Sequence, residues 1–111
     1  MIDMKKLENV LLELGFDDFR AGTNYIKRSV VEYDRTIAPR LSKDIYPTIA
    51  KVYGVSVGQV ERCIRTAVHI CFPRADEESR QKYFGATISP GRGLPSNGEL
   101  IARLAVLCRA D

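Results

Sequence analysis

The 111-residue sequence predicts an all-α fold of five or six helices that contains a helix-turn-helix. Apolar residues recur at intervals of three and four along most of the chain, which is the spacing of amphipathic helices. No stretch alternates polar and apolar residues for long enough to predict a strand. The strongest signal is the segment 47–65, PTIAKVYGVSVGQVERCIR, whose small and apolar residues fit two crossing helices joined by a tight turn. The length favours one domain over residues 1–111.

The composition limits the classes of protein to be considered. With 45% hydrophobic and 28% charged residues, the chain is typical of a globular protein rather than a disordered one. No apolar run is long enough to cross a bilayer, and the N-terminal residues MIDMKKLENV lack the apolar core of a signal peptide. We therefore expect a cytoplasmic protein with no membrane partner. The three cysteines lack CxxC spacing, which favours reduced thiols and predicts no metal site or cofactor.

The net charge of +3 is unevenly distributed along the chain. Residues 1–19 carry two basic and five acidic side chains, residues 20–74 carry ten basic and four acidic ones, and residues 75–111 carry five of each. The excess positive charge thus falls on the segment with the helix-turn-helix, as expected for a contact with the DNA phosphate backbone. A solvated basic surface without a partner explains the charge alone equally well.

Two amphipathic helices are predicted before the motif. The first covers residues 3–14 and ends at Gly15, a natural C-cap. The second opens at residues 22–24 and runs to about residue 34, where it is followed by a loop in which Pro39 discourages a helix. Their apolar stripes are Leu7, Val10, Leu11 and Leu14 in the first helix and Tyr25, Ile26, Val30 and Tyr33 in the second.

The start of the first helix of the motif is ambiguous. Ser42 or Asp44 would be a suitable first residue, but Pro47 lacks an amide hydrogen and would clash with the carbonyl group of Lys43. The helix therefore begins nearer Tyr46 or is kinked there. The sequence leaves both alternatives open.

Three residues control the geometry of the motif. Ala50 is small enough to lie where the two helices cross, and Gly54 can leave the first helix in a left-handed conformation. Val60, one turn into the second helix, is expected to fill the angle between them. Cys63 is expected to be buried between the same two helices. The other apolar positions are Ile49, Tyr53 and Val55.

The second helix of the motif is expected over residues 57–71. Ser56 is predicted to cap it, and Gln59 completes the pattern of a capping box. Its outward face is predicted to consist of Gly58, Glu61, Arg62 and Arg65, which are related by steps of three and four.

That outward face has the chemistry of a base-reading surface. Arg62 and Arg65 can each offer a planar pair of donors to guanine or to a phosphate, and Glu61 can accept from a cytosine amino group. The alternative is a surface ion pair between Glu61 and Arg65, which contributes little in water. We favour base reading, with Gly58 and Gln59 near the bases. Expected contacts with the DNA backbone are Ser56, Lys51, Lys43, Arg40 and Thr66, with Lys27 as a further candidate.

Two more helices are predicted after the motif, and no catalytic constellation. A short polar helix covers residues 76–84, a loop follows, and Ser96 with Glu99 forms a capping box that opens the last helix, residues 97–109. The loop sequence Gly91-Arg92-Gly93 lacks a nucleotide-binding pattern. His69 is the only histidine, so neither a His-based metal cluster nor a catalytic triad can be assembled, and we expect no enzyme. The buried face of the last helix is expected to be Leu100, Ile101, Leu104, Ala105 and Cys108.

The sequence resembles the C-terminal DNA-binding effector domain of the sporulation-initiation response regulator of endospore-forming bacteria. The similarity covers nearly all of the chain through the segments LLELGF, IYPTIAKVYGVSVGQVERCIRTAV, YFGAT and LPSNGELIA. The resemblance implies a six-helix, winged-helix-like domain without a clear wing that regulates transcription of sporulation-type genes. It implies that helix 57–71 enters the major groove of a TGTCGAA-like box. It also implies a homodimer on tandem boxes and contact with the sigma subunit of RNA polymerase near the segment after Phe72.

The chain departs from the family pattern at several positions. Gly58-Gln59 stands where the family commonly has Ser-Arg, Thr66 where it often has His, and Phe72 where it has Trp. The receiver domain is also absent from the sequence, which leaves a stand-alone effector or an excised fragment open. These departures leave a second function open: an interaction module with weakened DNA binding that pairs with a full-length response regulator.

Overall fold

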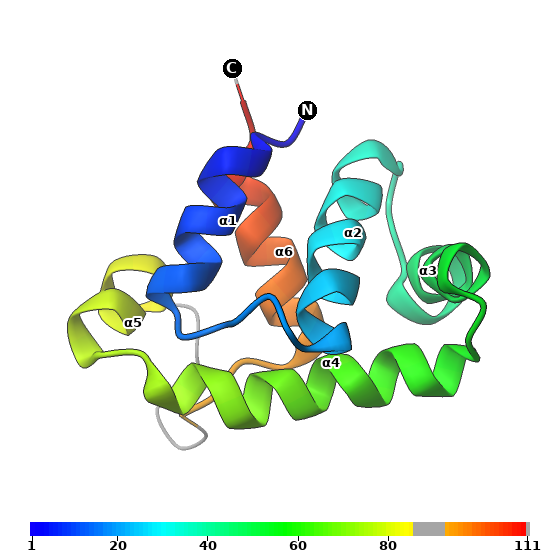
Figure 1. Ribbon diagram of the computed structural model, residues 1–111. Coiled ribbons are helices and arrows are strands. Elements are labelled where there is room, and N and C mark those ends of the chain that lie inside the picture. Colours follow the sequence, from blue (N-terminus) through cyan, green and yellow to red (C-terminus); the bar gives the residue numbers. More distant parts are fainter. Residues whose placement is uncertain (86–92, 111) are drawn as a thin grey trace.

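The fold is all-α in the residues that the computed structural model describes, 1–85 and 93–110 (Figure 1). A π-helical turn precedes the third helix and a 3₁₀ turn follows the fourth. The six α-helices of these residues confirm the predicted fold class and lie within about three residues of the predicted ranges. They are α1 (Met4–Glu13), α2 (Ala21–Arg35), α3 (Tyr46–Tyr53), α4 (Val57–Cys71), α5 (Glu77–Phe84) and α6 (Asn97–Cys108).

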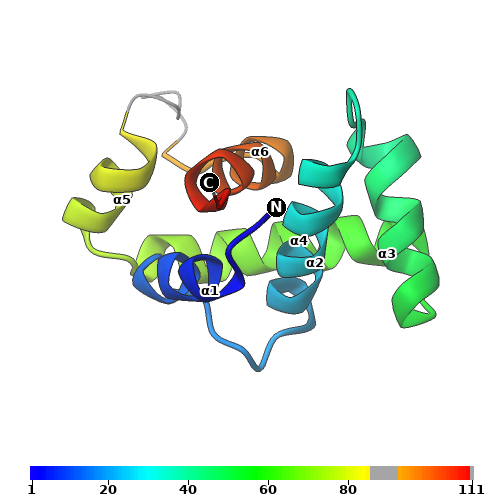
Figure 2. The same ribbon diagram turned by 90° about the horizontal axis from the view of Figure 1, so that it is seen from above.

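Helix α4 forms one long edge of the molecule, and α1, α2 and α6 stand on it (Figures 1 and 2). Helix α3 lies at the N-terminal end of α4 and α5 lies at its C-terminal end. The two chain ends meet at the opposite side, where the amide of Asp3 donates to the carbonyl oxygen of Cys108 at 2.7 Å. The outer face of α4 is therefore left uncovered by these helices.

The predicted apolar stripes form the core. The apolar stripe predicted for each of α1 and α6 is buried at every position, and α2 buries its stripe except for Tyr33, which is half-buried. Phe16 folds back on α1 after Gly15, which adopts a φ of +85°, and its amide donates to the carbonyl of Leu11 at 2.9 Å. No described helix has both the length and the apolar composition needed to cross a membrane.

The ambiguity at Pro47 is settled by a change of helix type. Residues Leu41–Ile45 form the π-helical turn, in which the amide of Tyr46 donates to the carbonyl of Leu41, and α3 begins at Tyr46. Pro47 stands in the first turn of α3, where its missing amide hydrogen costs no α-helical bond. The two alternatives are thus combined: the α-helix starts at Tyr46, and the chain before it is helical with a wider turn.

The helix-turn-helix has the predicted geometry at its three controlling residues. Ala50 is buried, Gly54 is left-handed with φ +67° and ψ +37°, and Val60 is fully buried. Tyr53, one of the apolar positions of the motif, ends α3 beside the turn and is 43% exposed, with its ring against that of Tyr25 at 4.9 Å between centroids. The prediction that Cys63 is buried is wrong. Cys63 is only half-buried, because the buried stripe of α4 passes through Val60 and Ile64 and leaves Cys63 on the flank that faces the start of α2.

Candidate nucleic-acid interface

The interface candidate begins at the N-terminal end of α4. The Ser56 side chain caps the helix by accepting from the amide of Gln59 at 3.0 Å. The side chain of Gln59 does not return the second bond of a capping box, so that prediction is only half right. A Cβ on Gly58 would meet only the Ser56 hydroxyl oxygen, 4.0 Å away. The first turn of α4 is therefore slim and open to a large partner.

The predicted outward face is present on α4. Gly58, Arg62 and Arg65 are exposed and Glu61 is half-buried. An ion pair joins the Glu61 carboxylate and the Arg65 guanidinium, whose side chains are 40% and 50% exposed. The surface pair considered from the sequence thus exists in this structure. Because exposed i, i+4 pairs contribute little in water, both groups can exchange this contact for another partner at small cost.

Two cavities flank α4 and divide its polar residues between them. On one flank, a cavity of about 330 Å³ lies at the start of α2 and is lined in part by Arg62 and Thr66. On the other, a cavity of about 430 Å³ lies at the starts of α3 and α6 and is lined in part by Glu61, Arg65 and His69. Arg62 and Arg65 are both exposed on the outward face and border different cavities.

The side chains predicted to contact the DNA backbone differ in their exposure and in whether another protein group already binds them. Lys51 on α3 and Lys43 on the π-helical turn are exposed, and neither forms an ion pair among the described residues. Arg40 is held by Asp44, with 3.4 Å between Nε and Oδ2. Lys27 is 17% exposed and is paired with Asp18 at 2.7 Å, so it is the least available of the candidates. Thr66 is exposed and Ser56 is already engaged as the cap.

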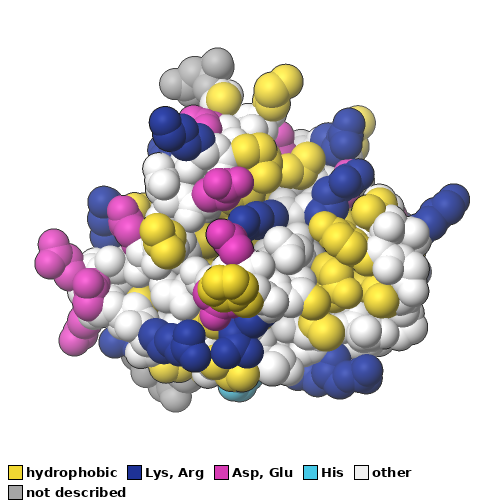
Figure 3. Space-filling view, in the orientation of Figure 1, with side chains coloured by type: hydrophobic (Ala, Val, Ile, Leu, Met, Phe, Trp, Pro, Cys, Tyr) yellow, Lys and Arg dark blue, Asp and Glu magenta, His cyan; other side chains and the backbone are white. Residues whose placement is uncertain are grey.

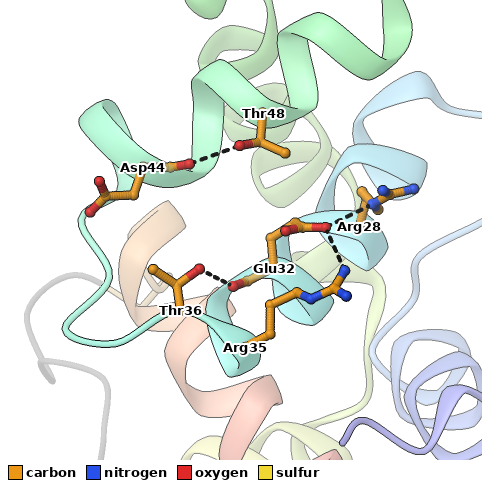
Figure 4. Close-up of polar contacts among 6 residues, drawn as sticks. All are labelled: Arg28, Glu32, Arg35, Thr36, Asp44 and Thr48. Atoms are coloured by element: carbon orange, nitrogen blue, oxygen red, sulfur yellow. Dashed lines mark hydrogen bonds and ion pairs between the residues drawn. The ribbon is translucent and has the colours of Figure 1, made fainter.

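Two further arginines near the motif share one carboxylate, which compensates half of their charge. Figure 4 shows Glu32 on α2 accepting from Arg28 Nε and Arg35 Nη1, both at 3.2 Å. In the same view the hydroxyl of Thr36 donates to the Glu32 carbonyl at 2.6 Å, and that of Thr48 to the Asp44 carbonyl at 3.1 Å. Part of the positive charge of residues 20–74 is therefore internally compensated, which leaves the lysines of α3 and the preceding turn as the freer cations.

The space-filling view shows where the remaining charge lies. Lys and Arg side chains follow the lower edge of Figure 3, where α4 runs in Figure 1, and acidic side chains gather at the α5 end. Sequence reasoning did not select Arg20, which lies beside Arg62 on the α2 flank of α4. It also did not select Asn97, whose side chain contacts both helices of the motif. Arg20 immediately precedes α2 and Asn97 is the first residue of α6. A position at the start of a helix is a weak signal of a functional role.

The described residues contain no group of three or more His, Cys, Asp and Glu side chains that could hold a metal ion. The three cysteines are free thiols, and burial raises the pKa of the Cys108 thiol. His69 is exposed near the C-terminal end of α4. Gly91 and Arg92 of the glycine-rich loop lie outside the described residues.

The model of the protein family described as the C terminal of sporulation initiation factor Spo0A matches residues 7–107. The chain belongs to this family. Domains of the Spo0A C-terminal family are DNA-binding regulatory domains of sporulation, and the match includes the complete helix-turn-helix.

Proposed function

We propose that this member of the Spo0A C-terminal family is a sequence-specific transcription regulator of sporulation-type genes. In this proposal α4 enters the major groove of a TGTCGAA-like box as the recognition helix. The observation that carries it is the first half of α4, where an open turn at Gly58 is followed by exposed Arg62 and Arg65 with no helix covering them. A major groove admits one α-helix, and residues at the N-terminal end of that helix reach deepest.

Each candidate base-reading residue of α4 has a proposed role. Arg62 and Arg65 donate pairs of hydrogen bonds to guanine, and Glu61 accepts from cytosine once DNA displaces its contact with Arg65. Gly58 lets the backbone approach the bases, and Gln59 follows it into the groove.

Contacts with the DNA backbone are proposed for the surroundings of α4. Lys51 and Lys43 carry most of this role because they are exposed and unpaired among the described residues. Arg40, Ser56 and Thr66 add donors to phosphate oxygens. We further propose that the protein acts in the cytoplasm as a homodimer on tandem boxes, and that the segment after Phe72, including α5, contacts the sigma subunit of RNA polymerase.

One observation favours a second candidate function. The Glu61–Arg65 ion pair occupies two of the three charged base-reading groups, and Gly58 offers no side chain. A domain with weakened DNA affinity would then serve as an interaction module that pairs with a full-length response regulator.

A titration of labelled duplexes decides between the two. We expect wild type to bind a TGTCGAA duplex more tightly than a scrambled duplex. Arg62→Ala should lose about 1–3 kcal/mol on the matched duplex and relax preference at one base pair. Arg80→Ala is the matched control, because it removes the same charge from α5, at the far end of α4. Equal binding of wild type to both duplexes, with no effect of Arg62→Ala, would exclude base reading and leave the interaction module.

A further inference from the structure

The side chain of Asn97 connects α6 to both helices of the helix-turn-helix. Its Nδ2 atom donates to the hydroxyl oxygen of Tyr46 at 3.2 Å and to the carbonyl oxygen of Glu61 at 3.1 Å. Tyr46 is the first residue of α3, and Glu61 lies in the second turn of α4. One amide group, 51 and 36 residues distant in sequence from these partners, thus contacts both helices that must hold a fixed angle.

The side-chain amide of Asn97 is positioned by the start of α6. Ser96 Oγ accepts from the amide of Glu99 at 3.1 Å, and Glu99 Oε1 accepts from the amide of Ser96 at 2.8 Å. This capping box fixes the chain on either side of Asn97. A Cβ on Gly98 would lie 3.3 Å from Leu41 Cδ1, so the same turn also packs on the π-helical turn before α3. The donor is therefore preorganised by contacts that do not involve α4.

The acceptor on α4 is a backbone carbonyl oxygen, so the hydrogen bond acts on the helix itself. A carbonyl oxygen has two lone pairs, and within an α-helix only one of them is used by the amide four residues later. Asn97 occupies the second lone pair at Glu61, whose side chain is paired with Arg65. The bond thus acts on the α4 backbone at Glu61 itself, one helical turn before Arg65.

One flank of α4 borders open space at this point. The cavity of about 430 Å³ lies next to the bond and is lined by Tyr46, Glu61, Arg65 and Asn97 among others. Because no atoms press against α4 on this flank, the Asn97 bonds add to the core contacts of Val60 and Ile64 in fixing the rotation of the helix.

We infer that Asn97 is a positioning residue for base reading, which sets the rotation of α4 relative to α3 and so places Glu61 and Arg65 in the groove. This inference rests on the proposed function of α4. Asn97 touches no base in this arrangement and acts only through the backbone of Glu61 and the hydroxyl of Tyr46.

Asn97→Asp is the sharpest test, because it keeps the shape of the side chain and removes the donor. An acidic residue in the first turn of a helix is favourable, so α6 is not weakened. The added charge lowers affinity for all duplexes alike and cancels in the ratio of matched to single-mismatch affinities. We expect that ratio to fall by about fivefold or more, the lower range of one good base contact. Asn9→Asp is the control, since it makes the same chemical change and adds the same charge at an exposed position of α1, and it should keep the wild-type ratio.

Hydrogen exchange of the α4 amides gives a readout that does not depend on DNA. Asn97→Asp should speed exchange in the first two turns of α4, and Asn9→Asp should not. Wild-type exchange in Asn97→Asp would overturn the inference whatever the DNA result. Failure of wild type to discriminate between duplexes would instead overturn the proposed function, and an unchanged ratio in Asn97→Asp beside a discriminating wild type would overturn only the role of Asn97.

Discussion

A Cβ atom on Gly22 would lie 2.2 Å from the carbonyl oxygen of Cys63, so α2 and α4 cross with their backbones in contact. The same atom would lie 2.9 Å from the Cβ of Ala67, another small residue at the crossing. This close approach brings the first turn of α2 beside Arg62 and Thr66. It also explains why Cys63 faces α2 instead of the angle between α3 and α4.

Gly22→Ala should therefore destabilise the fold. The added methyl group meets backbone atoms, which cannot move aside like the end of a side chain, so a loss of about 3 kcal/mol in the free energy of unfolding is expected. Gly58→Ala is the matched control, because its methyl group enters open space within a helix and should stabilise by up to about 1 kcal/mol. Urea denaturation measures both, and an unchanged midpoint for Gly22→Ala would show that the crossing is looser than described.

The helices were predictable because their signals are local. Residue size and backbone freedom at Ala50, Gly54 and Val60 encode the turn of the motif, and apolar periodicity encodes α1, α4 and α6. The outward position of Arg62 and Arg65 followed from the same periodicity, although what they bind stays a prediction.

What the sequence did not predict depends on contacts between distant segments. The π-helical turn resolves a conflict that Pro47 creates, but the pattern alone allowed two solutions. Tyr53 has the spacing of a buried residue, and it is exposed because it ends α3 beside the turn. The contact of Asn97 with Glu61 joins residues 36 positions apart and leaves no periodic trace in the sequence.

A pH-dependent contribution to stability is expected from Asp34, near the chain ends. The hydrogen bond from Arg109 Nε to Asp34 Oδ1, at 2.7 Å, holds the pKa of this carboxyl below its ordinary value. The folded state therefore favours the ionised form, so the stabilisation is fully present above the unfolded pKa and is lost as the pH falls through the folded pKa.

Asp34→Asn should accordingly lower the free energy of unfolding at pH 7, and its difference from wild type should shrink as the pH falls below about 4. Asp18→Asn is the control: Asp18 is 80% exposed in its pair with Lys27, and such pairs contribute little. Thermal unfolding at a series of pH values gives the comparison. A difference between Asp34→Asn and wild type that is the same at pH 7 and pH 3 would contradict the assignment.

Lys51 provides the test of backbone contact, because it is exposed on α3 and has no ion pair among the described residues. A lysine that neutralises one phosphate displaces about one condensed counterion, whatever the base sequence. Lys51→Ala should therefore weaken matched and scrambled duplexes alike and reduce the slope of log affinity against log salt by about one. Anisotropy titrations at several salt concentrations measure this slope.

Lys5→Ala is the control for Lys51→Ala, since Lys5 is also exposed but lies in the first turn of α1, on the side of the molecule away from α4. It removes the same charge and should leave the slope unchanged, which separates a direct phosphate contact from the effect of net charge. Equal slopes for the two variants would assign the salt dependence to net charge. A change in base preference with Lys51→Ala would instead mean that α3 sets the position of α4 in the groove. The predicted outcome, a lower slope with unchanged preference, would place Lys51 on the phosphate backbone and reserve sequence reading for α4.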